Sequence, residues 1–499
     1  MIAAIFDGGR RETRFVTALA VLLVLIRAAA FTFSERINFN SDQAIVGLMA
    51  KHLSEFRSFP FFYYGLNYLL AVQAWIIAPF FWIARPSVTV MRIPLVLLNV
   101  AAAVLLMRLL VSALRLRPAM AFVAALPFIV PTPLIASSFL DTSGSCGVEP
   151  LLYLLGLWII RDRPIAFGAL LAFGFLHREF TMYAVPALLL IHAVDGSLWT
   201  KDAVRWIGRM ISGFAMMWVA LDYVRLHMDG LSLLLQAQMA GKQVCFQAAE
   251  IADRIRYVAV VALPVLAGGT RMELAVHSLR SYAIVGSPIV GWVVLATMTF
   301  ILLRLVWIWR RRDSTSEAGF GVYLAIIGCC TLGAYSLTCN LVLDQPPLIR
   351  YINLALLLPI GLFAALMAIE PSARVKYAVA LIFVVWGTAN LADNVRVMRE
   401  TYVHPHPDPH RELTDFLLNQ RIRYAYADYW DAYIVDFLSR ERVIVASSRG
   451  PVRIPEYQRR VDENEKIAAT IVRMPCEGQL HVAVWCIQLP VNRSGDGAR

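Results

Sequence analysis

An aspartate near the start of the chain has the chemistry and the position of a general base. Asp42 follows Ser41, a typical helix-capping residue, and the apolar residues behind it, such as Ile45, Leu48 and Met49, recur at helical spacing. This pattern predicts a helix that is too polar to span a membrane and lies on its surface. Because the N-terminus of a helix favours an ionised carboxylate, Asp42 could accept a proton from a hydroxyl group. The alternative interpretation is that Asp42 only stabilises its own helix.

The composition indicates which elements would position this residue. Of the 499 residues, 59% are hydrophobic and only 16% are charged, and the apolar residues come in blocks of roughly membrane-spanning length. The sequence therefore predicts an all-α polytopic membrane protein. The formal charge of +11 comes from Lys and Arg residues between the apolar runs. A basic soluble module with interleaved aromatic residues is missing, which argues against a nucleic-acid partner.

The basic residues also predict how the chain crosses the membrane. Three arginines precede residue 15, so we expect a cytoplasmic N-terminus and Asp42 on the outer side. If residues 66–83 spanned the membrane, Arg115 would face outward, against the positive-inside rule. We therefore predict that 66–83 is a helix lying in the interface, within a long first outer loop at residues 34–89.

The remaining apolar runs complete the predicted topology. A second long outer loop is expected at residues 225–280, and the odd number of spans places the C-terminus outside the cell. Three of the runs are short and could span only with little tilt. About eleven spans are predicted, at residues 15–33, 90–111, 118–138, 149–160, 164–176, 180–194, 206–224, 282–309, 320–340, 351–369 and 377–391.

The last part of the chain changes in character. We predict a membrane domain at residues 1–392 and a small soluble α/β domain at 393–499, with a helix and short strands. The helix is expected at 411–419 and the strands at 442–446 and 479–488. Cys476 and Cys486 flank a possible hairpin in an oxidising compartment and could form a disulfide or remain two thiols.

Polar residues gather on the predicted outer face. Polar groups at membrane depth are costly, so their concentration on one side suggests a cavity or a reaction site. The candidates for substrate contacts are Asp42, Asp141, Glu149, His177, Arg178, Glu179, Asp344 and Arg350. For Arg178 and Glu179 the alternative is a pair that satisfies itself at a helix junction.

Three classes of membrane protein can be compared with this pattern. A transporter would carry ionisable or helix-breaking residues in the middle of its spans, often in repeated halves, and the sequence has neither feature. A hydrolase would require a nucleophile or metal motif, and G-x-S-x-G and H-E-x-x-H are both missing. A transferase needs a base, a cationic group for a phosphate leaving group and a groove for a lipid. The predicted outer face can supply these.

The sequence also resembles a known family. The segment SDQAIVGLMAKHLSEFRSFPFFYYG, the long first outer loop, the I-R-Y at 349–351 and the tail element YAYADYWDAYIVDFLSRERVIV are similar to bacterial GT-C class glycosyltransferases. These are relatives of the protein O-mannosyltransferases and the lipid A aminoarabinose transferases. The resemblance implies a polyprenyl-phosphate sugar donor, an acceptor (glycan, lipid or protein) on the outer face, and transfer with inversion. It also implies a bacterial inner-membrane location.

The resemblance assigns roles to four residues. Asp42 matches the first-loop acid that acts as general base or orients the acceptor, and Asp141 matches the position of a second-loop acid. Asp141 could equally well be an ordinary residue of a turn. Arg350, followed by Tyr351, resembles the basic residue that holds the donor phosphate. The alternative interpretation is that Arg350 only extends its side chain to the lipid headgroups.

Some residues depart from the family pattern. Asp42 is followed by Gln43 where many relatives have a second acid, and Gln73 stands where we would expect a glutamate. Since a hard cation needs several anionic oxygens, a divalent metal cofactor is not supported by the sequence. The tail residues around Tyr426 and Tyr429 could stack on a sugar or pack the soluble domain on the membrane domain. A transporter or flippase of a lipid-linked sugar remains the alternative function.

Overall fold

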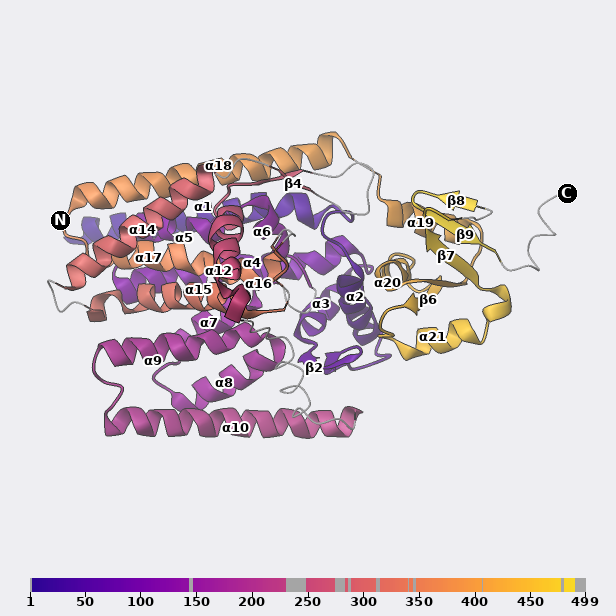
Figure 1. The fold of residues 1–499 in the computed structure, drawn as a ribbon, viewed down its shortest axis with the longest axis horizontal. Coiled ribbons are helices and arrows are strands. Elements are labelled where there is room, and N and C mark those ends of the chain that lie inside the picture. Colours follow the sequence, from indigo (N-terminus) through magenta and orange to yellow (C-terminus); the bar gives the residue numbers. More distant parts are fainter. Residues whose placement is uncertain are drawn as a thin grey trace.

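The computed structural model describes most of the chain. The described residues are 2–142, 147–229, 248–273, 283–285, 289–310, 315–339, 341–343, 347–405, 407–476 and 480–489. Their long axis runs from a helical bundle that contains the N-terminus to a smaller C-terminal domain (Figure 1). Asp344, one of the predicted substrate-binding residues, lies outside the described residues.

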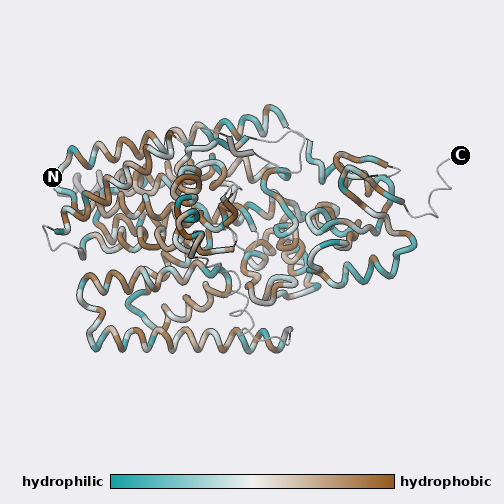
Figure 2. The backbone as a smooth tube through the Cα atoms, in the orientation of Figure 1, coloured by the Kyte–Doolittle hydropathy of each residue, from teal (hydrophilic) through white to brown (hydrophobic). Residues whose placement is uncertain are grey.

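The bundle is built from long and short apolar helices that lie side by side (Figure 1). Its elements are α1 (Ile2–Thr32), α4 (Val88–Leu114), α5 (Pro118–Ile129), α6 (Pro133–Ser138), α7 (Glu149–Ile159), α8 (Pro164–His177), η1 (Glu179–Tyr183), α9 (Ala184–Val194), α10 (Lys201–Asp229), α14 (Ile289–Trp309), η4 (Thr315–Ala318), α15 (Gly319–Leu337), α16 (Ile349–Ile352), η5 (Asn353–Leu356), α17 (Leu357–Ile369) and α18 (Ala373–Val403). Most residues along the bundle helices are hydrophobic, whereas the C-terminal domain contains more hydrophilic residues (Figure 2).

Six of the described helices are long and apolar enough to cross a membrane. They are Arg11–Thr32, Val88–Leu114, Gly291–Trp309, Gly319–Leu337, Ile349–Ile369 and Ala373–Val403, and each coincides with a predicted span. Four other predicted spans correspond to apolar helices of 10–17 residues, at Pro118–Ile129, Glu149–Ile159, Pro164–His177 and Glu179–Val194. The last predicted span, 206–224, lies within α10. The protein is thus a multi-pass membrane protein, and the number of eleven spans stays a prediction.

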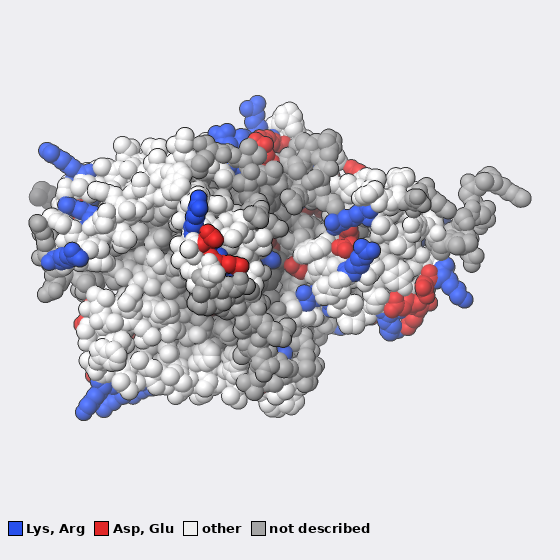
Figure 3. All heavy atoms as spheres, viewed as in Figure 1, with Lys and Arg blue, Asp and Glu red and all other residues white. Residues whose placement is uncertain are grey.

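Charged residues are gathered in a few places on the visible surface. In Figure 3 the visible Lys, Arg, Asp and Glu residues lie at the N-terminal end of the bundle, over α12 (Ile251–Tyr257), at the upper edge near the end of α18 and on the C-terminal domain. The bundle surface between them is mostly uncharged. α12 continues through a π-helical turn, η3 (Val258–Ala262), into α13 (Leu263–Leu266), and it runs across the direction of α14 and α15 (Figure 1). Smaller elements of this region are η2 (Ala248–Glu250) and the antiparallel strands β3 (Arg271–Glu273) and β4 (Ala283–Val285).

The first loop differs from the sequence prediction at one point. The run 66–83 is not a single helix, because Leu66–Leu70 forms strand β2, paired with β1 (Phe62–Tyr63), and only Val72–Ile83 forms the helix α3. Gly65, with φ of 66°, forms the turn between these strands, a conformation that favours glycine. The twelve-residue α3 is too short to be counted among the spanning helices and packs against α2 (Ser41–Ser54).

The C-terminal domain is a mixed five-stranded sheet covered by helices. The strand order is β6-β5-β7-β9-β8, with parallel pairs on both sides of β5 and antiparallel pairs around β9. α18 continues past the predicted domain boundary at residue 393 to Val403. The elements are α19 (Pro409–Asn419), β5 (Tyr424–Asp428), α20 (Tyr429–Leu438), β6 (Ile444–Arg449), α21 (Pro455–Asp462), η6 (Glu465–Ile467), β7 (Ala469–Arg473), β8 (Leu480–Val482) and β9 (Trp485–Gln488).

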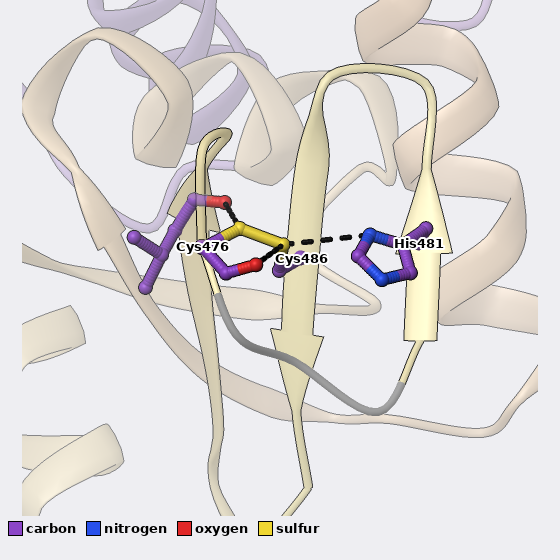
Figure 4. Close-up of a disulfide and its surroundings, with 4 residues drawn as sticks. Cys476, His481 and Cys486 are labelled. Atoms are coloured by element: carbon purple, nitrogen blue, oxygen red, sulfur yellow. Dashed lines mark hydrogen bonds between the residues drawn. A yellow bond between two sulfur atoms is a disulfide. The ribbon is translucent and has the colours of Figure 1, made fainter.

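A disulfide closes the end of this sheet. Cys476, which follows β7, is bonded to Cys486 of β9, and the imidazole of His481 lies beside the bridge (Figure 4). Of the two alternatives that the sequence left open for these cysteines, the structure contains the disulfide.

The C-terminal domain and the first loop share one hydrophobic core. Buried residues of α2 and α3, such as Leu48 and Ile77, pack with Tyr433 and Phe437 of α20 and with Tyr457 of α21. The domain also has its own core on the other side of the sheet, which includes Trp485. The two parts of the chain therefore meet through a continuous buried surface, which fixes the helix that carries Asp42.

Candidate active site

The helix that carries Asp42 begins as predicted, but its cap and its environment differ from the prediction. The N-cap is Asn40 and not Ser41: the Asn40 side chain accepts a hydrogen bond of 3.1 Å from the backbone N–H of Gln43. Almost all of α2 is buried, including Ser41 and every residue from Gln43 to His52. The sequence did not predict this burial, to which the packing of α20 against α2 contributes. The position of α2 at the membrane surface stays a prediction.

A buried arginine fixes the segment that leads into α2. Arg92 of α4 is 1% exposed and donates hydrogen bonds to the main chain between α1 and α2. Its acceptors are the carbonyl oxygens of Phe31, Ser34, Ile37 and Asn38. Gln43 donates to the same Asn38 carbonyl. These bonds give partners to backbone carbonyl groups in the segment that leads into α2, which would otherwise lack them.

Asp42 itself is held by groups from two distant parts of the chain. Its Oδ1 accepts a hydrogen bond from the hydroxyl of Tyr429, the first residue of α20. Its backbone carbonyl accepts a bond of 2.7 Å from the hydroxyl of Tyr63. Burial and the Asp42 carboxylate raise the pKa of Tyr429, so its hydroxyl stays protonated and acts as the donor.

A second polar group connects three of the predicted site residues. Gln73 of α3 donates 2.7 Å to Oε1 of Glu149 and 3.5 Å to the backbone carbonyl of Asp141. Glu149 and Asp141 are both buried, and the charge of Arg178 acts on the Glu149 carboxylate. Gly147 leaves the space for this carboxylate, since a Cβ there would lie 2.1 Å from Oε2. Gln73, which replaces an expected glutamate, thus contacts a glutamate from another helix.

The next group surrounds Arg350. The charges of Arg178 and Arg350 both act on Glu179, at the start of η1. The Arg350 guanidinium carbon lies 5.2 Å from the centre of the Tyr351 ring, and that ring packs edge-on against Phe180 at 6.5 Å. The predicted phosphate-binding residues and Glu179 are therefore neighbours, although they are about 170 positions apart in the chain.

The two groups are joined through the inner face of the first loop. A small cavity there is lined by Tyr63, Gln73 and Arg178, together with apolar residues of α2 such as Val46 and Met49. Asp42 and Asp141 both act electrostatically on Tyr63. Hydrogen bonds join Asp42 to Tyr63 and join Gln73 to Asp141 and Glu149. Electrostatic interactions link these two groups to Arg178 and, through Glu179, to Arg350.

His177 has a separate partner. Its Nδ1 lies 2.7 Å from the hydroxyl of Tyr153 on α7, with the two rings edge to face, and the histidine is fully buried. These contacts fix the end of α8 and keep the imidazole in the helix packing. Among the described residues, no three His, Cys, Asp or Glu side chains are grouped as metal ligands.

An apolar cavity of about 460 Å³ lies within the bundle. It is lined by residues of α9, α14, α15 and α17, among them Leu190, Leu302, Ile326 and Leu358. Leu358 follows Arg350 by eight residues along one continuous helical segment formed by α16, η5 and α17. The lining also reaches Trp309 at the end of α14 and Gly319 at the start of α15, and it is almost entirely apolar, as a groove for a lipid chain would be.

Sequence reasoning missed the contribution of the C-terminal domain to this site. Tyr429 and Arg453 lie next to Asp42, yet Tyr429 was considered only for sugar stacking or packing, and Arg453 was not considered. No local signal indicates their role, because residues 387 positions apart meet only through the docking of two domains. The tail element that contains Tyr429 is part of the family resemblance, and this could have indicated that the C-terminal domain contributes to the site.

The far end of α2 is tied to the same domain by an ionic cluster. Glu441, on the loop after α20, pairs with Lys51, His52 and Arg57 and accepts a 2.8 Å hydrogen bond from the hydroxyl of Tyr457. Burial alone would raise the pKa of Glu441, but hydrogen bonds from His52, Arg57 and Lys51 outweigh it and hold this pKa far below its ordinary value. The ionised glutamate is thus the centre of the contact.

This cluster predicts a pH dependence of stability. Because the pKa of Glu441 is lower in the folded protein, its contribution is complete above about pH 4.3, the unfolded value, and is lost as the pH falls below it. Glu441→Gln should lower the free energy of unfolding at pH 7 by about 3 kcal/mol, as expected for a broken buried ion pair. The difference in unfolding temperature between the purified variant and wild type should begin to shrink as the pH falls from about 5 to about 3. Parallel curves over this range would contradict the assignment.

Comparisons with known proteins identify the fold. No protein-family model and no characterised protein sequence matches the chain. Among solved structures, ArnT from Cupriavidus metallidurans bound to undecaprenyl phosphate is similar with a TM-score of 0.60 at 10% identity, over 94% of this chain and 98% of that chain. Its apo state gives a TM-score of 0.57, also at 10% identity, over 95% and 96%. The oligosaccharyltransferase of Archaeoglobus fulgidus follows with 0.47 at 12% identity, over 91% and 68%. The chain thus has the GT-C glycosyltransferase fold, as its sequence resemblance predicted.

Proposed function

We propose that the protein is an inverting membrane glycosyltransferase. It moves a sugar from a polyprenyl-phosphate donor to an acceptor on the extracytoplasmic face of a bacterial inner membrane, with its N-terminus in the cytoplasm. The observation that carries this proposal is the polar group of Asp141, Glu149 and Arg178. It acts electrostatically on Tyr63, which binds Asp42, and on Glu179, on which Arg350 also acts. The fold supports it, because a solved structure of the same fold contains undecaprenyl phosphate.

The chemistry follows from the two charged residues. Asp42 removes the proton from the acceptor hydroxyl, and the resulting oxygen attacks the anomeric carbon of the sugar. The bond from that carbon to the phosphate oxygen breaks, and its electron pair leaves with the lipid phosphate. Arg350 stabilises the charge that develops on this leaving group. Because attack and departure occur on opposite faces of the carbon, the configuration inverts.

The other site residues have supporting roles in this proposal. Glu149 and Asp141, joined through Gln73, position Arg178, and Glu179 and Tyr351 orient Arg350. Asp141 lies close enough to Tyr63 to influence the acceptor side.

The apolar cavity predicts where the prenyl chain lies. Ile326 lines it from α15, so Ile326→Trp should fill part of the groove and raise the KM for a long-chain donor about tenfold. A donor with a short prenyl chain should be affected much less. Leu303→Trp is the matched control, because Leu303 is 66% exposed on α14 and does not line the cavity. An equal effect of both variants, or no dependence on chain length, would place the chain elsewhere.

The proposed function is tested with purified protein in detergent. Incubation with a labelled polyprenyl-phosphate sugar and a mixture of envelope acceptors should release free polyprenyl phosphate and produce a labelled product with inverted configuration. In proteoliposomes, movement of intact donor across the bilayer without release of the phosphate would instead indicate a flippase. That outcome would contradict the transferase assignment.

A further inference from the structure

We infer that the C-terminal domain completes the active site, and that Tyr429 is the residue that positions Asp42. This inference rests on the proposed function, since it assigns a role toward the proposed base. The C-terminal domain is then more than an attachment to the membrane bundle, because it supplies part of the reaction centre. Three independent sets of contacts support it.

The first set aligns the beginnings of α2 and α20. Ser41 Oγ donates 2.6 Å to the backbone carbonyl of Tyr429, and the Tyr429 hydroxyl donates to Asp42 Oδ1. α20 starts at this tyrosine because Asp428 caps it, accepting from the N–H of Trp430 at 3.0 Å. Two hydrogen bonds between adjacent residues of one helix and a single residue of the other leave α2 little freedom to rotate about its axis.

The second set gives the tyrosine hydroxyl a direction. Arg453 Nε donates to the Tyr429 hydroxyl oxygen at 3.5 Å, its Nη1 donates to the carbonyl of Gly65 at 2.8 Å, and its backbone N–H donates to the Tyr433 hydroxyl at 2.7 Å. Because the guanidinium can only donate, the Tyr429 oxygen acts as acceptor toward it and directs its own proton to Asp42. A Cβ at Gly65 would lie 3.0 Å from Arg453 Cδ, so the first loop leaves space for this side chain.

The third set holds the rest of α2 against the same domain. In the middle of the helix, Gly47 faces the ring of Phe437, and a Cβ there would lie 2.5 Å from a ring carbon. At the end of the helix, Lys51 and His52 pair with Glu441. Since α2 contacts the domain at its start, middle and end, the orientation of Asp42 depends on the domain as a whole.

These contacts leave one carboxylate oxygen for the reaction. Oδ1 of Asp42 is engaged by Tyr429, and within the described part of the chain Oδ2 has no hydrogen bond. The ionisable groups that act on this position are Tyr63, Tyr429, Arg453 and, more distantly, Asp141. Tyr429 thus fixes which lone pair faces the acceptor, which is the role of a positioning residue.

Tyr429→Phe tests this role. The variant should lower kcat about 10- to 100-fold, as expected for the loss of a hydrogen bond to a charged group, with the donor KM and the unfolding temperature close to wild type. A loss of kcat without a change of the donor KM or of the unfolding temperature is not expected from a purely structural change.

Tyr426→Phe is the matched control. Tyr426 lies three residues earlier, and its hydroxyl donates 2.9 Å to the carboxylate of Asp462 and not to Asp42. The variant should keep wild-type kcat and KM. If Asp42→Asn abolishes transfer but Tyr429→Phe behaves like Tyr426→Phe, the positioning role is wrong and the proposed function stands. If Asp42→Asn retains transfer, the proposed function itself is wrong.

Discussion

Replacing Asp42 by asparagine is expected to lower the rate of sugar transfer by about 10²- to 10⁴-fold, the usual contribution of a general base. The change keeps the shape of the side chain and the acceptor for the Tyr429 hydroxyl, so α2 should keep its position. Binding of the polyprenyl-phosphate donor should be unchanged, because it depends on Arg350. The measurement is single-turnover transfer from pre-bound donor, together with a direct titration of donor binding.

Two results of that experiment would contradict the assignment. Transfer at a near wild-type rate would show that another group removes the proton. Loss of donor binding in parallel with transfer would show that Asp42 acts in binding or folding. A fall in transfer alone is the expected result.

Replacing Arg350 by alanine is expected to lower kcat by about 10²- to 10³-fold, corresponding to about 3–4 kcal/mol of leaving-group stabilisation. Arg350→Lys should recover a part of the activity, since a lysine supplies the charge but not the fork of donors. The measurement is the rate of polyprenyl-phosphate release for a series of leaving groups.

A matched arginine separates this role from simple anchoring. Arg256 is exposed on α12, within the predicted second outer loop, so it can also reach lipid headgroups. Arg256→Ala should leave the release rate unchanged. If both alanine variants have the same small effect, Arg350 is a headgroup anchor and not the phosphate ligand.

The sequence predicted the helix of Asp42 but not its surroundings. Apolar residues at helical spacing and an acid in the first turn are local signals, and they located α2 correctly. The burial of its polar side is a long-range effect, because α20 covers it from nearly 390 residues away. Local periodicity contains no information about a partner at that distance.

The short elements show a similar limit. The six long apolar helices were predicted because about 20 apolar residues are a strong signal for a membrane span. Residues 66–83 were read as one helix, whereas Gly65 and the pairing with Phe62–Tyr63 turn Leu66–Leu70 into a strand. A short apolar run can form either a helix or a strand, and its composition does not distinguish the two. The pairing with another segment decides which one forms.

The candidate site was predicted as a list of residues but not as a network. Charge and position selected Asp141, Glu149, Arg178 and Glu179, whose contacts the structure describes. Gln73 was interpreted as a missing carboxylate, and the structure shows that it donates to Glu149 from a different helix. Such pairs depend on the packing of three helices, which spacing in the sequence cannot specify.

The central claim is that Asp42 and Arg350 act on one donor molecule. The most direct test is a density map of the Asp42→Asn variant with a bound polyprenyl-phosphate sugar. The account predicts the phosphate at the guanidinium of Arg350, the prenyl chain in the cavity lined by Ile326, and the anomeric carbon facing residue 42. A phosphate bound away from Arg350, or a sugar separated from residue 42 by packed side chains, would contradict it.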